Sequence, residues 1–150
     1  MLTKKLAWFV LISLFTFDAV LSYWAVVYRG AHEANPAIKT IVETYPWLYF
    51  VTIPGLVLIM FPIYKGLTLF VNKFFRNIKK EIIEKVVSTS LALYWILGNS
   101  SINILFLVGY RQPAHVWFLT TTLAIIPSIF YALFLLNKLN SNSQPKMLQK

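Results

Sequence analysis

The sequence predicts an all-α membrane protein folded as a bundle of four transmembrane helices. Hydrophobic residues make up 58% of the 150 positions and charged residues only 13%, about half the charged share usual in soluble domains. The hydrophobic residues lie in four blocks, and each block is long enough to cross the hydrocarbon layer, which takes about 20 helical residues. The blocks cover residues 6–28, 47–71, 86–110 and 115–136. We therefore expect one domain over residues 1–137 and an integral, multi-pass protein of the cell membrane.

The basic residues predict how the four spans are oriented. Eleven Lys and Arg residues fall at one set of span ends and three fall at the opposite set. The positive-inside rule then places both termini and the loop over residues 72–85 in the cytoplasm. This placement also accounts for the net charge of +9, because basic flanks meet anionic lipid headgroups. The lipid bilayer is thus the expected partner, and nucleic acid is not.

Two segments outside the spans are expected at the cytoplasmic side. Apolar residues alternate with basic ones at helical spacing over residues 72–85, which predicts an amphipathic helix lying on the headgroups. Its contacts to lipid would come from Lys73, Arg76, Lys79 and Lys80. Residues 138–150 are polar and have no apolar period, so they are expected to form a flexible tail.

The loop between the first two spans predicts a short extracytoplasmic helix. Asn35 followed by Pro36 fits an N-cap residue with proline at the first helical position, where its missing N–H costs nothing. The helix is expected over residues 36–45, and Arg29, His32 and Glu33 lie just before it.

Asp18 is the one acidic residue inside an apolar block of the sequence. It lies about 15 Å from the end of its helix at 1.5 Å per residue, which is near the middle of the bilayer. An ionisable group at that depth almost always faces the bundle interior and a polar partner. Ser22 and Arg29 follow on the same stripe of the helix. Asn99 and Asn103 of the third span reach a similar depth, and we expect Asp18 to form hydrogen bonds with one or both.

The residues able to carry acid–base or metal chemistry are few. They are Asp18, His32, Glu33 and His115. Adjacent His32 and Glu33 point apart on a regular backbone, and the chain has neither an HExxH motif nor a GxSxG motif. The absence of cysteine excludes thiolate ligands and nucleophiles. Whether these residues bind a metal stays open, no cofactor is required by the sequence, and a non-catalytic role is favoured over an enzyme.

The stretch over residues 17–38 resembles a pattern of the form D…G-x-x-E-x-N-P. This pattern is similar to that of an uncharacterised, domain-of-unknown-function family of small four-span membrane proteins in archaea and bacteria. The matching positions are Asp18, Gly30, Glu33, Asn35 and Pro36. The resemblance implies the four-span fold, and it implies that these residues share a site or a structural lock. It implies no particular reaction.

Three functions follow from these observations. The first is a non-catalytic accessory or scaffold subunit of a larger membrane complex, because bulky aromatic faces suit association with other membrane subunits or self-association and short loops leave no soluble domain. The alternative is a small ion or proton transporter or channel that uses Asp18 as its binding carboxylate. The third is an intramembrane enzyme built on Asp18, Glu33 and His32.

Overall fold

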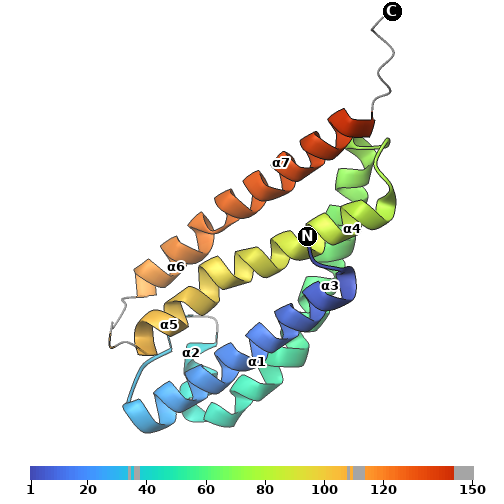
Figure 1. The fold of residues 1–150 in the computed structure, drawn as a ribbon. Helices are drawn as coiled ribbons and strands as arrows, with labels where there is room; N and C mark the ends of the chain where they lie inside the picture. Colours follow the sequence, from blue (N-terminus) through green and yellow to red (C-terminus); the bar gives the residue numbers. More distant parts are fainter. Residues whose placement is uncertain (34, 36–37, 108, 110–113, 144–150) are drawn as a thin grey trace, which may run out of the picture.

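The computed structural model describes residues 1–33, 35, 38–107, 109 and 114–143, and this part of the chain is all-α. Within it, four helical stretches are long and apolar enough to cross a membrane: Lys4–Arg29, Pro46–Phe74, Lys80–Leu107 and Phe118–Ser141. They lie side by side as a helical bundle (Figure 1). The predicted all-α fold class and the prediction of four long apolar helices that could cross a membrane are therefore confirmed. The elements are α1 (Lys4–Arg29), α2 (Lys39–Thr44), η1 (Pro46–Leu48), α3 (Tyr49–Phe74), α4 (Lys80–Trp95), η2 (Ile96–Ser100), α5 (Ser101–Leu107), α6 (Ala114–Leu123) and α7 (Ile125–Ser143).

Helix α1 is capped at both ends. The Thr3 hydroxyl caps its start by accepting a hydrogen bond from the Leu6 amide at 3.2 Å. Gly30 ends it with φ 59° and ψ 29°, a left-handed conformation that glycine adopts without strain. Between these caps α1 contacts both α3 and α4, while α4 also contacts α7. The caps therefore fix where the first span ends and where the following loop leaves the bundle.

The buried core lies at one end of the bundle, which we call the Lys4 end. It consists of Tyr64, Ile78, Ile83, Val86, Val87 and Leu136. Trp8 from the start of α1 and Leu139 from α7 pack against this cluster. The first turns of α1 and the last turns of α7 thus lie at the same end. Lys4 also pairs with Glu84 here, with Nζ and Oε2 2.8 Å apart. The opposite end of the bundle is called the Arg29 end.

The amphipathic helix expected over residues 72–85 is not present. Helix α3 ends at Phe74 and α4 begins at Lys80, and a turn closed by the Ile78 amide on the Phe75 carbonyl joins them. Ile78 and Ile83 are buried in the core rather than facing headgroups. The four basic residues predicted to contact lipid are nevertheless exposed. A tight turn lets the apolar residues join the bundle core, and this is why the helical spacing was misleading.

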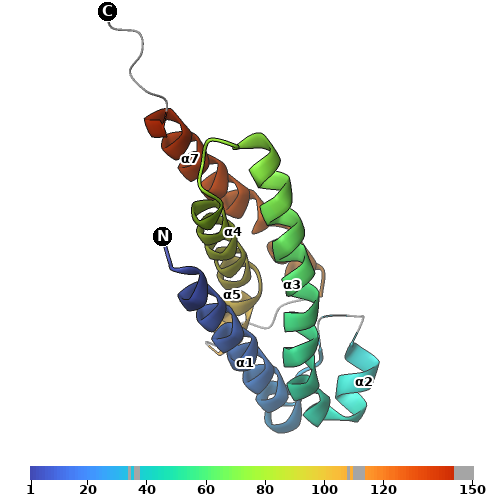
Figure 2. The same ribbon diagram turned by 90° about the vertical axis from the view of Figure 1, so that its right-hand side faces the viewer.

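Two other predicted boundaries also shift. Helix α7 continues to Ser143, so the first residues of the expected polar tail at 138–150 are helical, and residues 144–150 lie outside the described part. At the Arg29 end, α2 covers Lys39–Thr44, and residues 36 and 37, where the expected helix begins, lie outside the described part. The Asn35 main-chain carbonyl accepts the amides of Ile38 and Lys39, and α2 has no side-chain cap. Val42 holds the short helix against Ala19 and Tyr49, beside the start of α3 (Figure 2).

The third and fourth spans are both interrupted. The third contains the π-helical turn η2, and α6 packs against that turn. The fourth is interrupted at Ala124, between α6 and α7. Pro127 lies in the first turn of α7, where it has no N–H to donate to the preceding turn and its ring crowds that turn. A Cβ on Gly98 of η2 would stand 3.3 Å from the Thr121 Cα and 3.4 Å from the Ala124 Cβ. Gly98 therefore lets the two spans approach closely at their interruptions.

Replacing Gly98 tests this close approach. We expect Gly98→Val to lower the free energy of unfolding by about 1–3 kcal/mol, the usual cost of overpacking, because the backbone of α6 has to move. Unfolding in mixed detergent micelles measures the change. The control is Gly66→Val in α3, where an added Cβ meets nothing within 4 Å. Equal losses in both variants would contradict the close contact.

Candidate functional site

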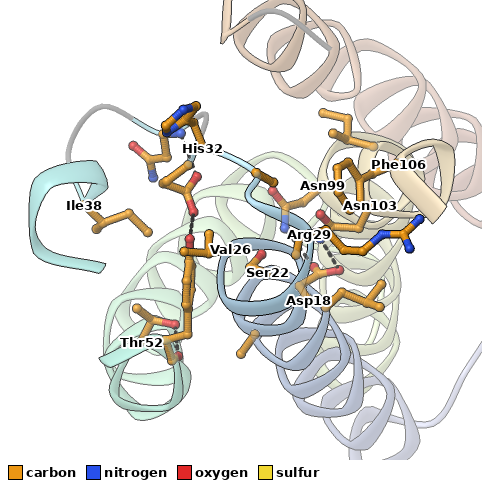
Figure 3. A pocket seen from close by; sticks show the side chains of 18 of the residues that line it. Asp18, Ser22, Val26, Arg29, His32, Ile38, Thr52, Asn99, Asn103 and Phe106 are labelled. Atoms are coloured by element: carbon orange, nitrogen blue, oxygen red, sulfur yellow. Dashed lines mark hydrogen bonds between the residues drawn. The ribbon is translucent and has the colours of Figure 1, made fainter. Parts of the chain in front are cut away.

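Four side chains of the third span donate hydrogen bonds to the Asp18 carboxylate. Oδ2 accepts the indole N–H of Trp95 at 2.5 Å, the Asn99 amide at 2.8 Å and the Ser100 hydroxyl at 3.3 Å. Oδ1 accepts the Asn103 amide at 2.9 Å. Asp18 itself is only 5% exposed. Both bonds that the sequence predicted, to Asn99 and to Asn103, are present. We call Asp18 with these four donors the Asp18 cluster (Figure 3 shows Asp18, Asn99 and Asn103).

The spacing of the third span explains this convergence. Trp95, Asn99 and Asn103 follow one another at four-residue intervals, so they share one face of a helix. Trp95 lies about as far from the start of α4 as Asp18 lies from the start of α1. The π-helical turn η2 covers both Asn99 and Ser100, and π-turns of this kind are frequent at functional sites. Sequence reasoning missed Trp95, although its place four residues before Asn99 was the available signal.

Phe15 holds the Trp95 ring in place. The two ring centroids lie 4.4 Å apart in an edge-on arrangement at 69°, a favourable geometry for aromatic pairs. Phe15 is fully buried, with 1% of its surface exposed. It lies three residues before Asp18 on the same helix. The indole N–H is thereby directed at the carboxylate by packing as well as by its hydrogen bond.

A second polar group forms at the Arg29 end, around Glu33. The Glu33 Oε2 accepts a hydrogen bond from the Tyr49 hydroxyl at 2.6 Å, and its Oε1 accepts one from the main-chain N–H of Asn35 at 2.7 Å. The Glu33 amide donates to Oε1 of Glu43 at 2.9 Å, and Nδ1 of His32 lies 3.2 Å from the same oxygen. We call these five residues the rim cluster. Neither Tyr49 nor Glu43 was predicted as a site residue, because only the folded loop brings them to Glu33.

The pKa of the Glu43 carboxyl is lowered. Partial desolvation raises this pKa, but the Glu33 amide, the His32 ring and the charge of Lys39 together lower it by more. The pKa of Glu43 therefore lies below its ordinary value of 4.5. The ionised carboxylate is therefore the form that accepts the Glu33 amide and holds the loop against α2. This places the pH sensitivity of the rim cluster on the acid side of neutrality.

A cavity of about 630 Å³ connects the Asp18 cluster and the rim cluster. Its walls come from α1, α3, α4, η2, α5 and the loop after Gly30, and both Asp18 and Glu33 line it. Arg29, Gly30, His32 and Gly109 also line it and are exposed. The cavity therefore extends from the middle of α1 to the surface at the Arg29 end, over about 16 Å at 1.5 Å per residue.

The remaining predicted residues fall around this cavity in different ways. Ser22 lines it one turn above Asp18, as the predicted stripe requires. Arg29 lines its mouth, and its guanidinium lies 5.1 Å from the centroid of the Trp24 ring. Pro36 and the side chain of His115 lie outside the described part of the chain. Thr120, Thr121 and Thr122 donate to main-chain carbonyls of their own helix, so they add no polar group to the site.

The chemistry open to the site is hydrogen bonding and charge pairing. Within the described residues no three His, Cys, Asp or Glu side chains come together as metal ligands. Comparisons with models of protein families, with curated proteins and with solved structures find no match to the chain. The resemblance of residues 17–38 to a four-span family therefore stays a prediction. The fold and its apolar spans define a small, multi-pass membrane protein.

Removal of the Asp18 carboxylate tests how far the bundle depends on it. Asp18→Ala removes the acceptor of the Trp95 indole and the Asn103 amide in an apolar setting, and we expect a loss of about 2–3 kcal/mol in the free energy of unfolding. Unfolding in mixed micelles is the measurement. Ser22→Ala, one turn along the same helix, is the control and is expected to stay within about 0.5 kcal/mol of the parent. Similar losses in the two variants would show that the carboxylate is not the anchor.

Acidification tests the rim cluster. Because the pKa of Glu43 is lower in the folded chain than its ordinary value of 4.5, its stabilising effect is fully present above about pH 4.5 and is lost as the pH falls through the lowered pKa. We expect the hydrogen-exchange protection factor of the Glu33 amide to fall over that range. In Glu43→Gln the protection factor is expected to be low at all pH values. The same acid-induced fall in this variant would assign the effect to another group.

Proposed function

We propose that the chain is a membrane protein that binds a small molecule in the cavity between Asp18 and Glu33. The observation that carries the proposal is the cavity itself, whose volume of about 630 Å³ lies within the range of ligand pockets, about 300–1,000 Å³. It has the composition typical of such pockets. Its walls contain apolar side chains, with Val26, Leu56 and Phe106 among them, and polar groups gather at the floor and at the mouth.

The geometry supports a pocket that opens at the Arg29 end. The described lining residues run from Phe15 and Trp95 to the Arg29 end, whereas the Lys4 end holds the buried core around Tyr64 and Ile83. The excess of basic residues at the Lys4 end supports a cytoplasmic location for it under the positive-inside rule. In this orientation a ligand enters the pocket from the extracytoplasmic side, through the loop that carries His32 and Glu33.

The hydrogen bonds of Asp18 and Glu33 favour some of the functions predicted from sequence over others. An ion or proton pathway through Asp18 receives less support, because four donors from the third span already bond to the carboxylate. An enzyme built on Asp18, Glu33 and His32 is less favoured than binding, because the Glu33 oxygens accept bonds from Tyr49 and Asn35. The accessory role in a larger membrane complex stays compatible with a ligand-binding subunit.

The absence of cysteine from the chain allows a clean accessibility test. We expect Ser22→Cys, in the pocket wall, to react with a membrane-impermeant methanethiosulfonate added outside intact cells, because water reaches the pocket through its mouth. The matched control is Thr16→Cys on the same helix, an exposed position outside the lining, where lipid is expected to suppress thiolate formation. No reaction at Ser22→Cys from either side of the membrane would contradict an open pocket.

Filling the pocket tests binding. We expect a small molecule to co-purify with the parent chain in detergent-free lipid particles and to be depleted at least tenfold in Ser22→Phe, whose larger side chain occupies the cavity. Mass spectrometry of the extracted particles, normalised to protein, measures the depletion. Thr16→Phe, in the lipid-facing control position, is expected to keep the parent level. Identical small-molecule profiles in all three preparations would count against the proposal.

A further inference from the structure

We propose that the ligand of this pocket is an organic cation, an ammonium group carried on an apolar body. The inference rests on the small-molecule pocket proposed above and adds the charge of its occupant. Three features of the lining support it: the balance of formal charge, the acceptor position left on Asp18, and the aromatic rings of the walls.

The described lining residues carry more negative than positive charge. Asp18 and Glu33 are two carboxylates, and Arg29 is the only Lys or Arg among these residues. With His32 neutral, the lining has a formal charge of −1. The Arg29 side chain is exposed at the mouth and lies over the Trp24 ring, which is not part of the lining. The floor therefore holds a carboxylate with no cationic side chain among its described neighbours.

The hydrogen bonds of Asp18 leave room for one more donor. An ionised carboxylate accepts about four bonds, two at each oxygen. Oδ2 already accepts three, whereas Oδ1 accepts one, from Asn103. All four donors come from the third span, and Asp18 also lines the cavity. An ammonium N–H that reaches Oδ1 would complete the acceptor capacity of that oxygen, whereas an anion at the same place would be repelled by the carboxylate.

Aromatic rings line the cavity on several sides. Phe15 comes from α1, Tyr49 from α3, Trp95 from α4 and Phe106 from α5. The faces of such rings attract cations, and the attraction grows where water is excluded. The same rings pack against an apolar body. A bare metal ion would instead need several oxygen ligands at short distances, and within the described residues no three His, Cys, Asp or Glu side chains come together.

A matched set of probes separates charge from shape. The cation 1-adamantylamine, the neutral 1-adamantanol and the anion 1-adamantanecarboxylate carry the same cage and differ in one substituent. Equilibrium dialysis against the parent chain in lipid nanodiscs measures binding, and Ser22→Phe nanodiscs subtract partitioning into lipid. We expect the amine to bind at least tenfold more tightly than the alcohol, and the carboxylate to show no binding above the Ser22→Phe background.

Two variants then test whether the carboxylates cause the preference. Asp18→Asn keeps a side-chain acceptor of the same size and is expected to weaken the amine at least tenfold while changing the alcohol less than twofold. Glu33→Gln is expected to act in the same direction with a smaller effect, and it serves if Asp18→Asn does not fold. Thr16→Phe, outside the lining, is expected to bind all three probes as the parent does.

The possible failures are distinguishable. If the alcohol binds the parent as tightly as the amine and Ser22→Phe binds neither, the pocket stands and the cation inference is overturned. If the amine is preferred but neither carboxylate variant reduces the preference, the electrostatic basis of the inference is overturned. If no probe binds the parent above the Ser22→Phe background, both the pocket and the cation inference are contradicted.

Discussion

The desolvation of one carboxylate sets the arrangement of the bundle. Asp18 lies in the middle of a helix that is otherwise apolar, and a bare charge there would cost a few kcal/mol even on insertion scales. The third span removes that cost by presenting Trp95, Asn99, Ser100 and Asn103 to it. Since lipid tails are as apolar as the helix faces, these directional bonds help to orient the third span against α1.

The same constraint explains why a cavity can persist beside the cluster. The hydrogen bonds hold η2 and α5 on one side of α1, while Ala19, Val42 and Tyr49 hold α2 and the start of α3 on the other. At Gly98, η2 packs closely against α6. The space between α5 and α3 is thus bounded by two sets of contacts, one on each side of α1. The loop with Glu33, bonded to Tyr49, then forms the mouth of that space.

Much of the fold and part of the site could be predicted from sequence. Hydropathy and length identify the four spans, because crossing the hydrocarbon requires long apolar helices. Depth and helical spacing place Asn99 and Asn103 opposite Asp18. The hydrogen bond from Trp95 was not predicted, because a tryptophan in an apolar span is usually interpreted as a packing residue rather than as a hydrogen-bond donor. The partners of Glu33 could not be predicted, because the folded loop brings them together. The helical periodicity over residues 72–85 was misleading, because it does not reveal that the chain turns back over residues 75–79.

One residue contributes to both the stability of the bundle and the floor of the pocket, and this has a consequence for function. A carboxylate held by four donors from one span has little freedom to follow a passing ion, so it suits recognition more than conduction. The buried core and the Lys4–Glu84 pair at the Lys4 end stabilise the bundle there without drawing on the described cavity-lining residues. The contacts at the Lys4 end therefore do not use the polar groups at the Arg29 end, which are available for a ligand. This separation follows from the positions of the few acidic side chains along the chain.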